Sequence, residues 1–169
     1  MDTNEIRFEK VSFEEFNRTA YLGSRLPPPP EEEVYRIWEG IKLPQRATAG
    51  SAGYDFFLPH GIELQPGYPV VFATGIRCIM PKGIFLALFA RSGLGFKYGV
   101  RLRNGTGIID SDYCLAPNEG HIRASLTTEE PIELEAGAKF MQGIFLPYTL
   151  VNSDTADGIR TGGFGSTGV

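Results

Sequence analysis

Two carboxylates and a phenol follow a short apolar pair near the middle of the chain, in the segment Asp110-Ser111-Asp112-Tyr113. The segment Asn104-Gly105-Thr106-Gly107 before it has the composition of a tight turn, because glycine adopts positive φ without steric cost. Ile108-Ile109 then predicts a strand, and alternation along it sends Asp110 and Asp112 to one face. An aspartate placed there can orient a water molecule and accept its proton, which is general-base chemistry. A solvated hairpin end is the alternative for this stretch alone.

An anion site is predicted at Arg91-Ser92-Gly93, where the apolar run 83–90 ends. If a short helical turn starts there, its free N–H groups and its dipole attract anions. Arg91 supplies charge and a hydrogen-bonding fork, and Ser92 supplies a hydroxyl without bulk. A charged turn with an ordinary N-cap is the alternative.

Three further segments complete an ordered set with these two. They are Ala52-Gly53-Tyr54-Asp55-Phe56, Gln142-Gly143-Ile144-Phe145 and the glycine-rich end from Arg160 to Gly168. In this order the five segments resemble the five motifs of the homotrimeric dUTP diphosphatases (dUTPases). The resemblance runs from about residue 41 to the last residue, and residues 1–40 fall outside it. Five motifs in order are a far more specific signal than any one of them.

The resemblance implies hydrolysis of dUTP to dUMP and pyrophosphate, a reaction that limits uracil in DNA and supplies dUMP for thymidylate synthesis. Asp110 would be the general base that activates a water for attack on the α-phosphorus. In such chemistry, positioning and charge neutralisation carry most of the effect. The substrate-binding residues that the resemblance implies are Arg91, Ser92, Gly93, Asn104, Gly107, Ile108, Ile109, Tyr113, Gln142, Arg160, Phe164, Gly165 and Ser166.

Within that set, the resemblance implies that Arg91-Ser92-Gly93 bind the triphosphate and that Gln142 donates to a phosphate oxygen. It also implies that Asn104 and the backbone of residues 107–110 bind the hydrogen-bonding edge of uracil. Such groups demand one donor and acceptor order, so cytosine would leave buried groups unpaired. Tyr113 would stack on the deoxyribose and leave no room for a 2′-hydroxyl; a strand-end aromatic with a wet hydroxyl is the alternative.

The segment 151–169 is small and polar, and we expect it to be mobile when free and to become ordered on a ligand. The resemblance implies that this C-terminal arm closes over the site of a neighbouring subunit in a homotrimer with shared sites. Arg160 would pair with the γ-phosphate and Phe164 would stack on the base. Gly165 would allow close approach, and Ser166 would add a hydroxyl.

Mg²⁺ is the cofactor that the resemblance implies. Asp55 would act near the ion, through its water shell; a turn carboxylate is the alternative for this residue. A protein cage is not expected, because Mg²⁺ keeps several waters and is bound through few carboxylates plus substrate phosphates.

Two departures from the family pattern stand out. An insertion, Cys114 to Glu119, replaces the usual short turn after Tyr113, and it leaves open whether Arg123 lies near the base. Lys139 stands where many relatives carry arginine, which weakens bidentate contacts there.

Composition narrows the class of protein. A chain of 169 residues is expected to form one domain, and its net charge of −4 argues against a nucleic-acid surface. No apolar run has the length of a membrane span, and no signal peptide is apparent. Cys78 and Cys114 lack metal-type spacing and are expected to be free thiols in a reducing cytosol, so we expect a cytoplasmic protein.

The elements that must position these residues divide into three parts. Residues 1–40 predict a helical extension: Ser12 and Glu15 form a capping box, a proline spacer covers 27–30, and a second helix runs from Pro30 to Gly40. Residues 41–150 predict short strands bounded by the many Gly and Pro residues, hence an all-β sandwich or barrel. The strands are expected at 53–58, 69–74, 75–80, 84–89, 97–102, 121–128 and 140–150. The resemblance implies a distorted jelly-roll β-barrel, with 151–169 as a flexible arm.

Three alternative functions differ from this prediction. A dCTP deaminase shares the fold but needs a glutamate at the pyrimidine and lacks the Asp-Ser-Asp-Tyr turn. A nucleotide-gated regulatory protein would keep the site and act through a protein partner, a role that the N-terminal helices and Pro27 to Pro30 could serve. An all-β structural protein would bind no nucleotide.

Overall fold

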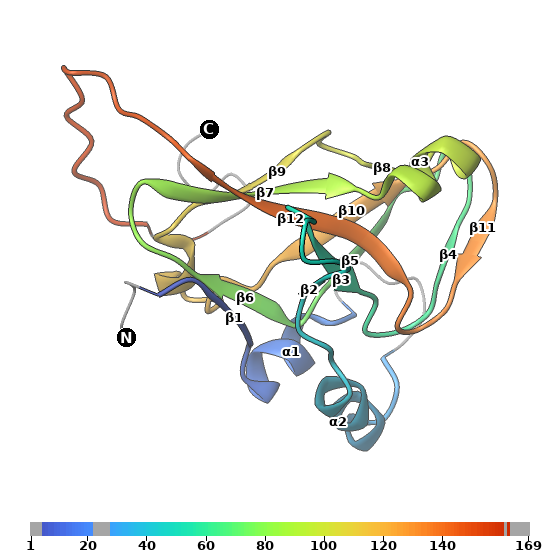
Figure 1. Ribbon diagram of the computed structural model, residues 1–169. Coiled ribbons are helices and arrows are strands. Elements are labelled where there is room, and N and C mark those ends of the chain that lie inside the picture. Colours follow the sequence, from blue (N-terminus) through green and yellow to red (C-terminus); the bar gives the residue numbers. More distant parts are fainter. Residues whose placement is uncertain (1–4, 22–27, 161, 163–169) are drawn as a thin grey trace.

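The computed structural model describes residues 5–21, 28–160 and 162 of the 169-residue chain. Its strands form a distorted jelly-roll barrel, with two helices of the N-terminal extension packed below it (Figure 1). The all-β jelly-roll prediction is therefore confirmed. The elements in chain order are β1 (Arg7–Lys10), α1 (Phe13–Thr19), α2 (Glu31–Glu39), β2 (Gln45–Arg46), β3 (Tyr54–Phe57), β4 (Ile62–Leu64), β5 (Val70–Ala73), β6 (Ile76–Ile79), β7 (Ile84–Ala90), α3 (Ser92–Tyr98), β8 (Arg101–Leu102), β9 (Gly107–Ile109), the 3-10 helix η1 (Tyr113–Leu115), β10 (Arg123–Thr127), β11 (Ile132–Leu134) and β12 (Lys139–Pro147).

The largest sheet carries most of the site residues. Its order is β2-β3-β12-β7-β9, all antiparallel, and β12 lies at its centre. A three-stranded sheet, β5-β10-β8, and the pairs β11-β4 and β1-β6 complete the barrel. Alternation along β10 turns Ala124 and Leu126 into the core, as the period of two requires. At the centre of the core the rings of Phe72 and Phe140 meet edge to face, with centroids 5.1 Å apart.

The N-terminal extension adds a small second core to the barrel. Val11, Phe16, Ala20 and Val34 bury one another between α1 and α2, and Ile41 packs against both this cluster and the main core. The Ser12 half of the predicted capping box is confirmed, since the Ser12 hydroxyl accepts from the N–H of Glu15, but the N–H of Ser12 donates to Glu119 instead of Glu15. The extension also contains a strand, β1, which was not predicted from the sequence. This strand pairs antiparallel with β6.

The second helix begins one residue later than predicted. Pro30 has ψ 145° and is the N-cap, so α2 runs from Glu31 to Glu39, with Gly40 as its C-cap. Glu31, Glu32 and Glu33 occupy its first turn, where carboxylates complement the helix dipole. Of the proline spacer, Pro27 lies outside the described residues.

Most predicted strands are confirmed within a few residues, but the strand at 97–102 is wrong. Helix α3 covers its first part and ends at Gly99, whose φ of 64° is a left-handed C-cap. Only Arg101–Leu102 is extended, and β12 ends at Pro147 instead of continuing to residue 150. The strand expected to carry Asp110 and Asp112 stops at Ile109 and the chain turns into η1, although both carboxylates still face one side, where Arg160 contacts both.

Cys78 and Cys114 are free thiols, as predicted, and both are buried. Burial raises the pKa of Cys78 to about 12, and it also raises the pKa of Cys114. Among the described residues, no helix has the length and apolar character needed to cross a bilayer.

Candidate functional site

Strand pairing gathers the predicted phosphate-binding residues at one end of the five-stranded sheet. Gln142 on β12 lies opposite Asp55 on β3 and, on its other side, opposite Phe89 on β7. Arg91 follows β7 directly, so it projects at the same end as this pair. We call Asp55, Arg91, Lys139, Gln142 and the start of α3 the phosphate-side cluster.

Asp55 is the buried centre of the phosphate-side cluster and is 5% exposed. Its Oδ1 lies 3.3 Å from Nε of Arg91, and its Oδ2 lies 2.9 Å from Nζ of Lys139. Both cationic side chains are 38% exposed, so each keeps donors that face solvent. One carboxylate thus positions two cations, and the excess positive charge suits a polyphosphate.

These contacts do not fit Asp55 as a partner of Mg²⁺. Both of its oxygens already form ion pairs with cations, and the side chain is buried. Within residues 5–21, 28–160 and 162, no group of three or more His, Cys, Asp or Glu side chains could hold a metal ion. The turn-carboxylate alternative is wrong as well, because Asp55 lies within strand β3.

The start of α3 has the geometry predicted for an anion site. Arg91 is the N-cap without a side-chain cap bond, and its carbonyl accepts from the N–H groups of Leu94 and Gly95. The N–H groups of Ser92 and Gly93 precede these and have no partner within the helix. A Cβ at Gly93 would meet nothing within 4 Å, so the approach to these N–H groups is open.

The side chain of Gln142 fills the space next to Gly53, which has no side chain of its own. A Cβ at Gly53 would collide with the amide oxygen of Gln142. The glycine of the first motif therefore leaves the space that the glutamine side chain of the fourth motif occupies. The strand register therefore explains why Gly53, Asp55 and Gln142 belong to one unit.

The predicted uracil-binding turn lies between β8 and β9. Gly105 has a φ of 75°, and the amide of Asn104 donates to the carbonyl of Thr106 at 3.3 Å. Strand β9 follows at the edge of the five-stranded sheet, so one side of its backbone lacks a strand partner among the described residues. Gly107 packs closely against β7, because a Cβ there would lie only 3.1 Å from Cβ of Leu88. Ile108 is 54% exposed.

Arg160 joins the C-terminal arm to the predicted general base. Its Nε donates to Oδ1 of Asp112 at 2.7 Å, and its Nη2 donates to Oδ2 of Asp110. Its guanidinium also lies over the ring of Tyr113, 5.7 Å from the centroid. The sequence interpretation, which placed Arg160 at a phosphate, did not foresee this ion pair. Phe164, Gly165 and Ser166 lie outside the described residues.

Tyr113 is fixed at its hydroxyl end. The hydroxyl donates to the carbonyl of His121 at 2.9 Å and accepts from Nδ2 of Asn118 at 2.8 Å. Burial raises the pKa of Tyr113, against the hydrogen bond from Asn118, and the phenol stays neutral. The alternative of a wet hydroxyl is wrong, and sequence reasoning missed both anchors because neither carries a motif signal.

The single chain keeps the two halves of the site apart. Along β7, Leu88 pairs with Gly107 and Leu86 pairs with Ile109, so Asp110 follows opposite Phe85 near the start of β7, whereas Arg91 lies beyond its end. Strand residues rise about 3.3 Å each, which places the attachment points of Arg91 and Asp110 roughly 20 Å apart. Figure 1 shows α3 beyond the tip of the β7 arrow, away from the start of that strand.

Comparison with known proteins identifies relatives. The dUTPase family profile matches residues 39–168. The deoxyuridine 5′-triphosphate nucleotidohydrolase of Lactococcus lactis subsp. lactis (strain IL1403) is 38% identical over 134 residues, 76% of this chain and 89% of the relative. The dUTPase from Streptococcus mutans is 41% identical, with a TM-score of 0.60 over 66% of this chain and 89% of that one. A mutant dUTPase of phage phi11 of S. aureus, described as coordinating a structural Mg(II) ion, has a TM-score of 0.63 over 92% of this chain and 98% of its own; at 16% identity the likeness concerns the fold alone.

Proposed function

The chain belongs to the dUTPase family and hydrolyses dUTP, and on that premise we propose that its active site is assembled between the protomers of a homotrimer. The separation of Arg91 from Asp110 along β7 is the observation that supports this proposal. A base aimed at the α-phosphorus and an arginine on the same triphosphate have to lie within a few ångströms of one substrate. A neighbouring protomer is needed to bring the missing half.

The phosphate-side cluster binds the triphosphate in this proposal. Arg91 and the amide of Gln142 donate to phosphate oxygens, together with the N–H groups of Ser92 and Gly93. Asp55 positions Arg91 through their ion pair, and Lys139 neutralises the second oxygen of Asp55.

The turn and edge strand of another protomer read the nucleoside. Asn104 and the backbone of Gly107, Ile108 and Ile109 provide donors and acceptors for the uracil edge, and the open edge of β9 supports this role. The buried ring of Tyr113, fixed at its hydroxyl, supports the deoxyribose.

Asp110 is the general base. A water held by its carboxylate attacks the α-phosphorus, gives up its proton to Asp110, and pyrophosphate leaves with the electrons of the broken P–O bond. While Arg160 donates to Oδ2 of Asp110, that oxygen cannot hold the water. The arm therefore transfers Arg160 from the carboxylates to the γ-phosphate when it closes, and Phe164, Gly165 and Ser166 cover the base and phosphates.

Mg²⁺ enters this proposal with the substrate. The phage phi11 relative coordinates a structural Mg(II) ion, and a divalent ion on the triphosphate would neutralise part of its charge. The described residues of this chain offer no cage for the ion. The two free cysteines fit a reducing compartment, so we place the enzyme in the cytoplasm.

Complementation between inactive variants tests the shared site. Arg91→Ala and Asp110→Asn chains, unfolded together and refolded as mixed trimers, should recover activity in about a quarter of their sites if each site takes one residue from each of two chains. Arg91→Ala mixed with Gln142→Ala is the matched control, because both changes fall in the phosphate-side cluster of a single chain. No recovery in the first mixture, with trimers present by ultracentrifugation, would refute the shared site and leave dUTP hydrolysis untouched.

A further inference from the structure

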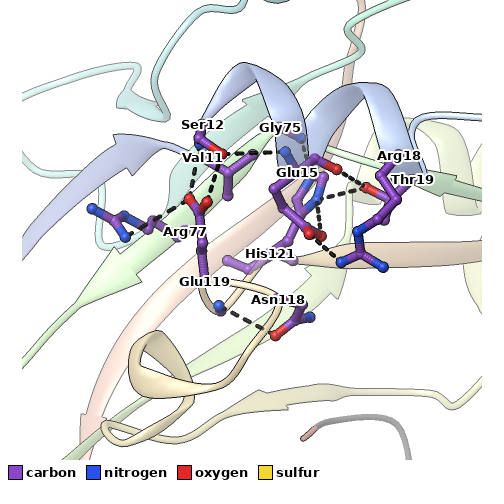
Figure 2. A network of polar contacts seen from close by, with 12 residues as sticks. Val11, Ser12, Glu15, Arg18, Thr19, Gly75, Arg77, Asn118, Glu119 and His121 are labelled. Atoms are coloured by element: carbon purple, nitrogen blue, oxygen red, sulfur yellow. Dashed lines mark hydrogen bonds and ion pairs between the residues drawn. The ribbon is translucent and has the colours of Figure 1, made fainter.

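The N-terminal extension, which lies outside the dUTPase pattern, contacts the insertion 114–119. Ser12, at the start of α1, donates from its backbone N–H to Oε2 of Glu119 at 2.8 Å and from its hydroxyl to Oε1 at 2.5 Å (Figure 2). Glu119 is the last residue of the insertion, and its φ of 56° is unusual for a residue with a side chain. Such a conformation persists only where contacts hold it. Here the two hydrogen bonds to Ser12 act together with the N–H of Glu119, which donates to the carbonyl of Ala116 at 2.8 Å, and with Arg77, 4.0 Å from Oε2 of Glu119.

This contact replaces half of the capping box of α1. In a capping box the glutamate three residues into the helix returns to the backbone N–H of the cap residue. Here Glu119 takes that N–H, and the side chain of Glu15 is free to turn inward. Glu15 is 5% exposed, and its Oε1 lies 3.2 Å from Nδ1 of His121.

His121 is held from three sides, and two of the holding residues belong to α1. Its Nε2 accepts from the N–H of Gly75 at 2.8 Å, so Nδ1 carries the ring proton. Nδ1 lies 3.0 Å from Oγ1 of Thr19. The Thr19 hydroxyl itself donates a hydrogen bond to the carbonyl of Glu15, so it accepts from Nδ1. Thr19 and Glu15 are thus the acceptors that set the orientation of this fully buried ring (Figure 2).

The carbonyl of His121 is in turn the anchor of the Tyr113 hydroxyl, at 2.9 Å. The second anchor, Asn118, lies within the insertion and also accepts from the N–H of Gly120 at 3.3 Å. Both anchors of Tyr113 therefore lie in the segment 118–121, which α1 holds at Glu119 and His121.

We propose that helix α1 is a positioning element of the sugar site, with Thr19 and Glu119 as positioning residues that act through His121 and Asn118 on the ring of Tyr113. The extension thereby sharpens the preference for deoxyribose over ribose. This inference rests on the proposed contact of Tyr113 with the deoxyribose.

The test measures kcat/KM for dUTP and for UTP in the full-length enzyme. Thr19→Val removes the acceptor at Nδ1 of His121 with little change in volume. Glu119→Gly removes the contact with Ser12 and accommodates the positive φ. Each variant should raise the ratio of UTP to dUTP kcat/KM by roughly three- to tenfold, the usual effect of one hydrogen bond. Thr19→Ser, which keeps the hydroxyl, should restore the wild-type ratio.

Two comparison variants separate positioning from plain stability. Val34→Ala loosens the small core between α1 and α2 without touching residues 113–121, so it should lower the Tm and leave the ratio unchanged. Tyr113→Ala should abolish most of the discrimination. If Tyr113→Ala loses discrimination while Thr19→Val and Glu119→Gly lower only the Tm, the inference is overturned and the sugar contact stands. If Tyr113→Ala still discriminates, both the proposed sugar contact and the inference are overturned.

Discussion

Nε of Arg160 lies 2.7 Å from Oδ1 of Asp112, so the one arginine of the C-terminal arm is attached to the short segment that carries the proposed general base, Asp110. The same guanidinium reaches Asp110 with a second nitrogen. The arm and the base are therefore coupled in the structure: Arg160 has to leave its two carboxylates before it can serve a phosphate.

Replacing Arg160 should affect activity and leave stability nearly unchanged. Arg160→Ala should lower kcat/KM for dUTP by roughly 10- to 100-fold, the range expected for a lost hydrogen bond to a charged group. The carboxylates that it leaves are about half exposed, with side-chain fractions of 49% and 47%, so the Tm should move little. Asp112→Asn serves as the control, because it weakens the ion pair while keeping the arginine. A large loss of Tm in Arg160→Ala would contradict the proposed role.

Removal of the base should separate binding from turnover. Asp110→Asn is expected to lower kcat by about 10² to 10⁴, because the amide cannot accept the proton of the attacking water. The variant should still gain heat stability from a non-hydrolysable dUTP analogue, since the binding groups remain. Near-normal turnover would remove Asp110 from its role.

The ion pairs of Asp55 give a test of its function. Asp55→Asn should raise the KM for dUTP, because Arg91 loses the carboxylate that orients it. The loss of stability should be only about 1 kcal/mol, since both cationic partners are 38% exposed and well solvated. Lys139→Arg keeps the charge and should retain activity. A shift in the Mg²⁺ activation constant with an unchanged KM would instead assign Asp55 to the metal.

His121 predicts a loss of stability in mild acid. Burial, together with the positive charge of Arg123, lowers its pKa to about 3, so the folded protein keeps the ring neutral where the unfolded chain is protonated. Stability is therefore complete above pH 6.5 and falls as the pH drops toward 3, by about 2 kcal/mol between pH 7 and pH 5. Urea unfolding at both values, in wild type and His121→Gln, measures the effect. Equal slopes against pH in the two proteins would contradict it.

Both thiols should be unreactive in the folded protein. The pKa of Cys78 is raised to about 12 and the side chain is 1% exposed, while Cys114 is 4% exposed with its pKa also raised. Because the thiolate is the reactive form, a disulfide reagent at pH 8 should label neither residue quickly until denaturant is added. Rapid labelling of the native enzyme would show that one of them is accessible.

Sequence patterns correctly predicted the helices and strands that are determined by residues adjacent in the chain. Ser12 capped α1 as expected, the strands rich in apolar residues formed, and the chain after β7 became helical at Arg91. The strand predicted at 97–102 failed because Gly99, in a left-handed conformation, ends a helix there. Strands of three residues such as β4 and β11 carry too few side chains for a periodic signal.

The partners of site residues could not be predicted, because the fold brings them from distant strands and loops. Asp55 meets Lys139 only through the pairing of β3 with β12. His121 has no motif around it, and its contacts with α1 depend on how the extension docks. The motifs predicted the chemistry of the site, whereas the contacts between residues of different motifs are visible only in the folded structure.

The hydrogen bonds between Ser12 and Glu119 have a consequence for ancestry. A leading helix without the longer loop after Tyr113 would lose the carboxylate that completes its cap, and the loop without the helix would leave Glu119, with its positive φ, without its two hydrogen bonds to Ser12. The two additions to the common dUTPase body should therefore be inherited as a pair. Among descendants of the same lineage, we expect any chain that has shed one of them to have shed the other.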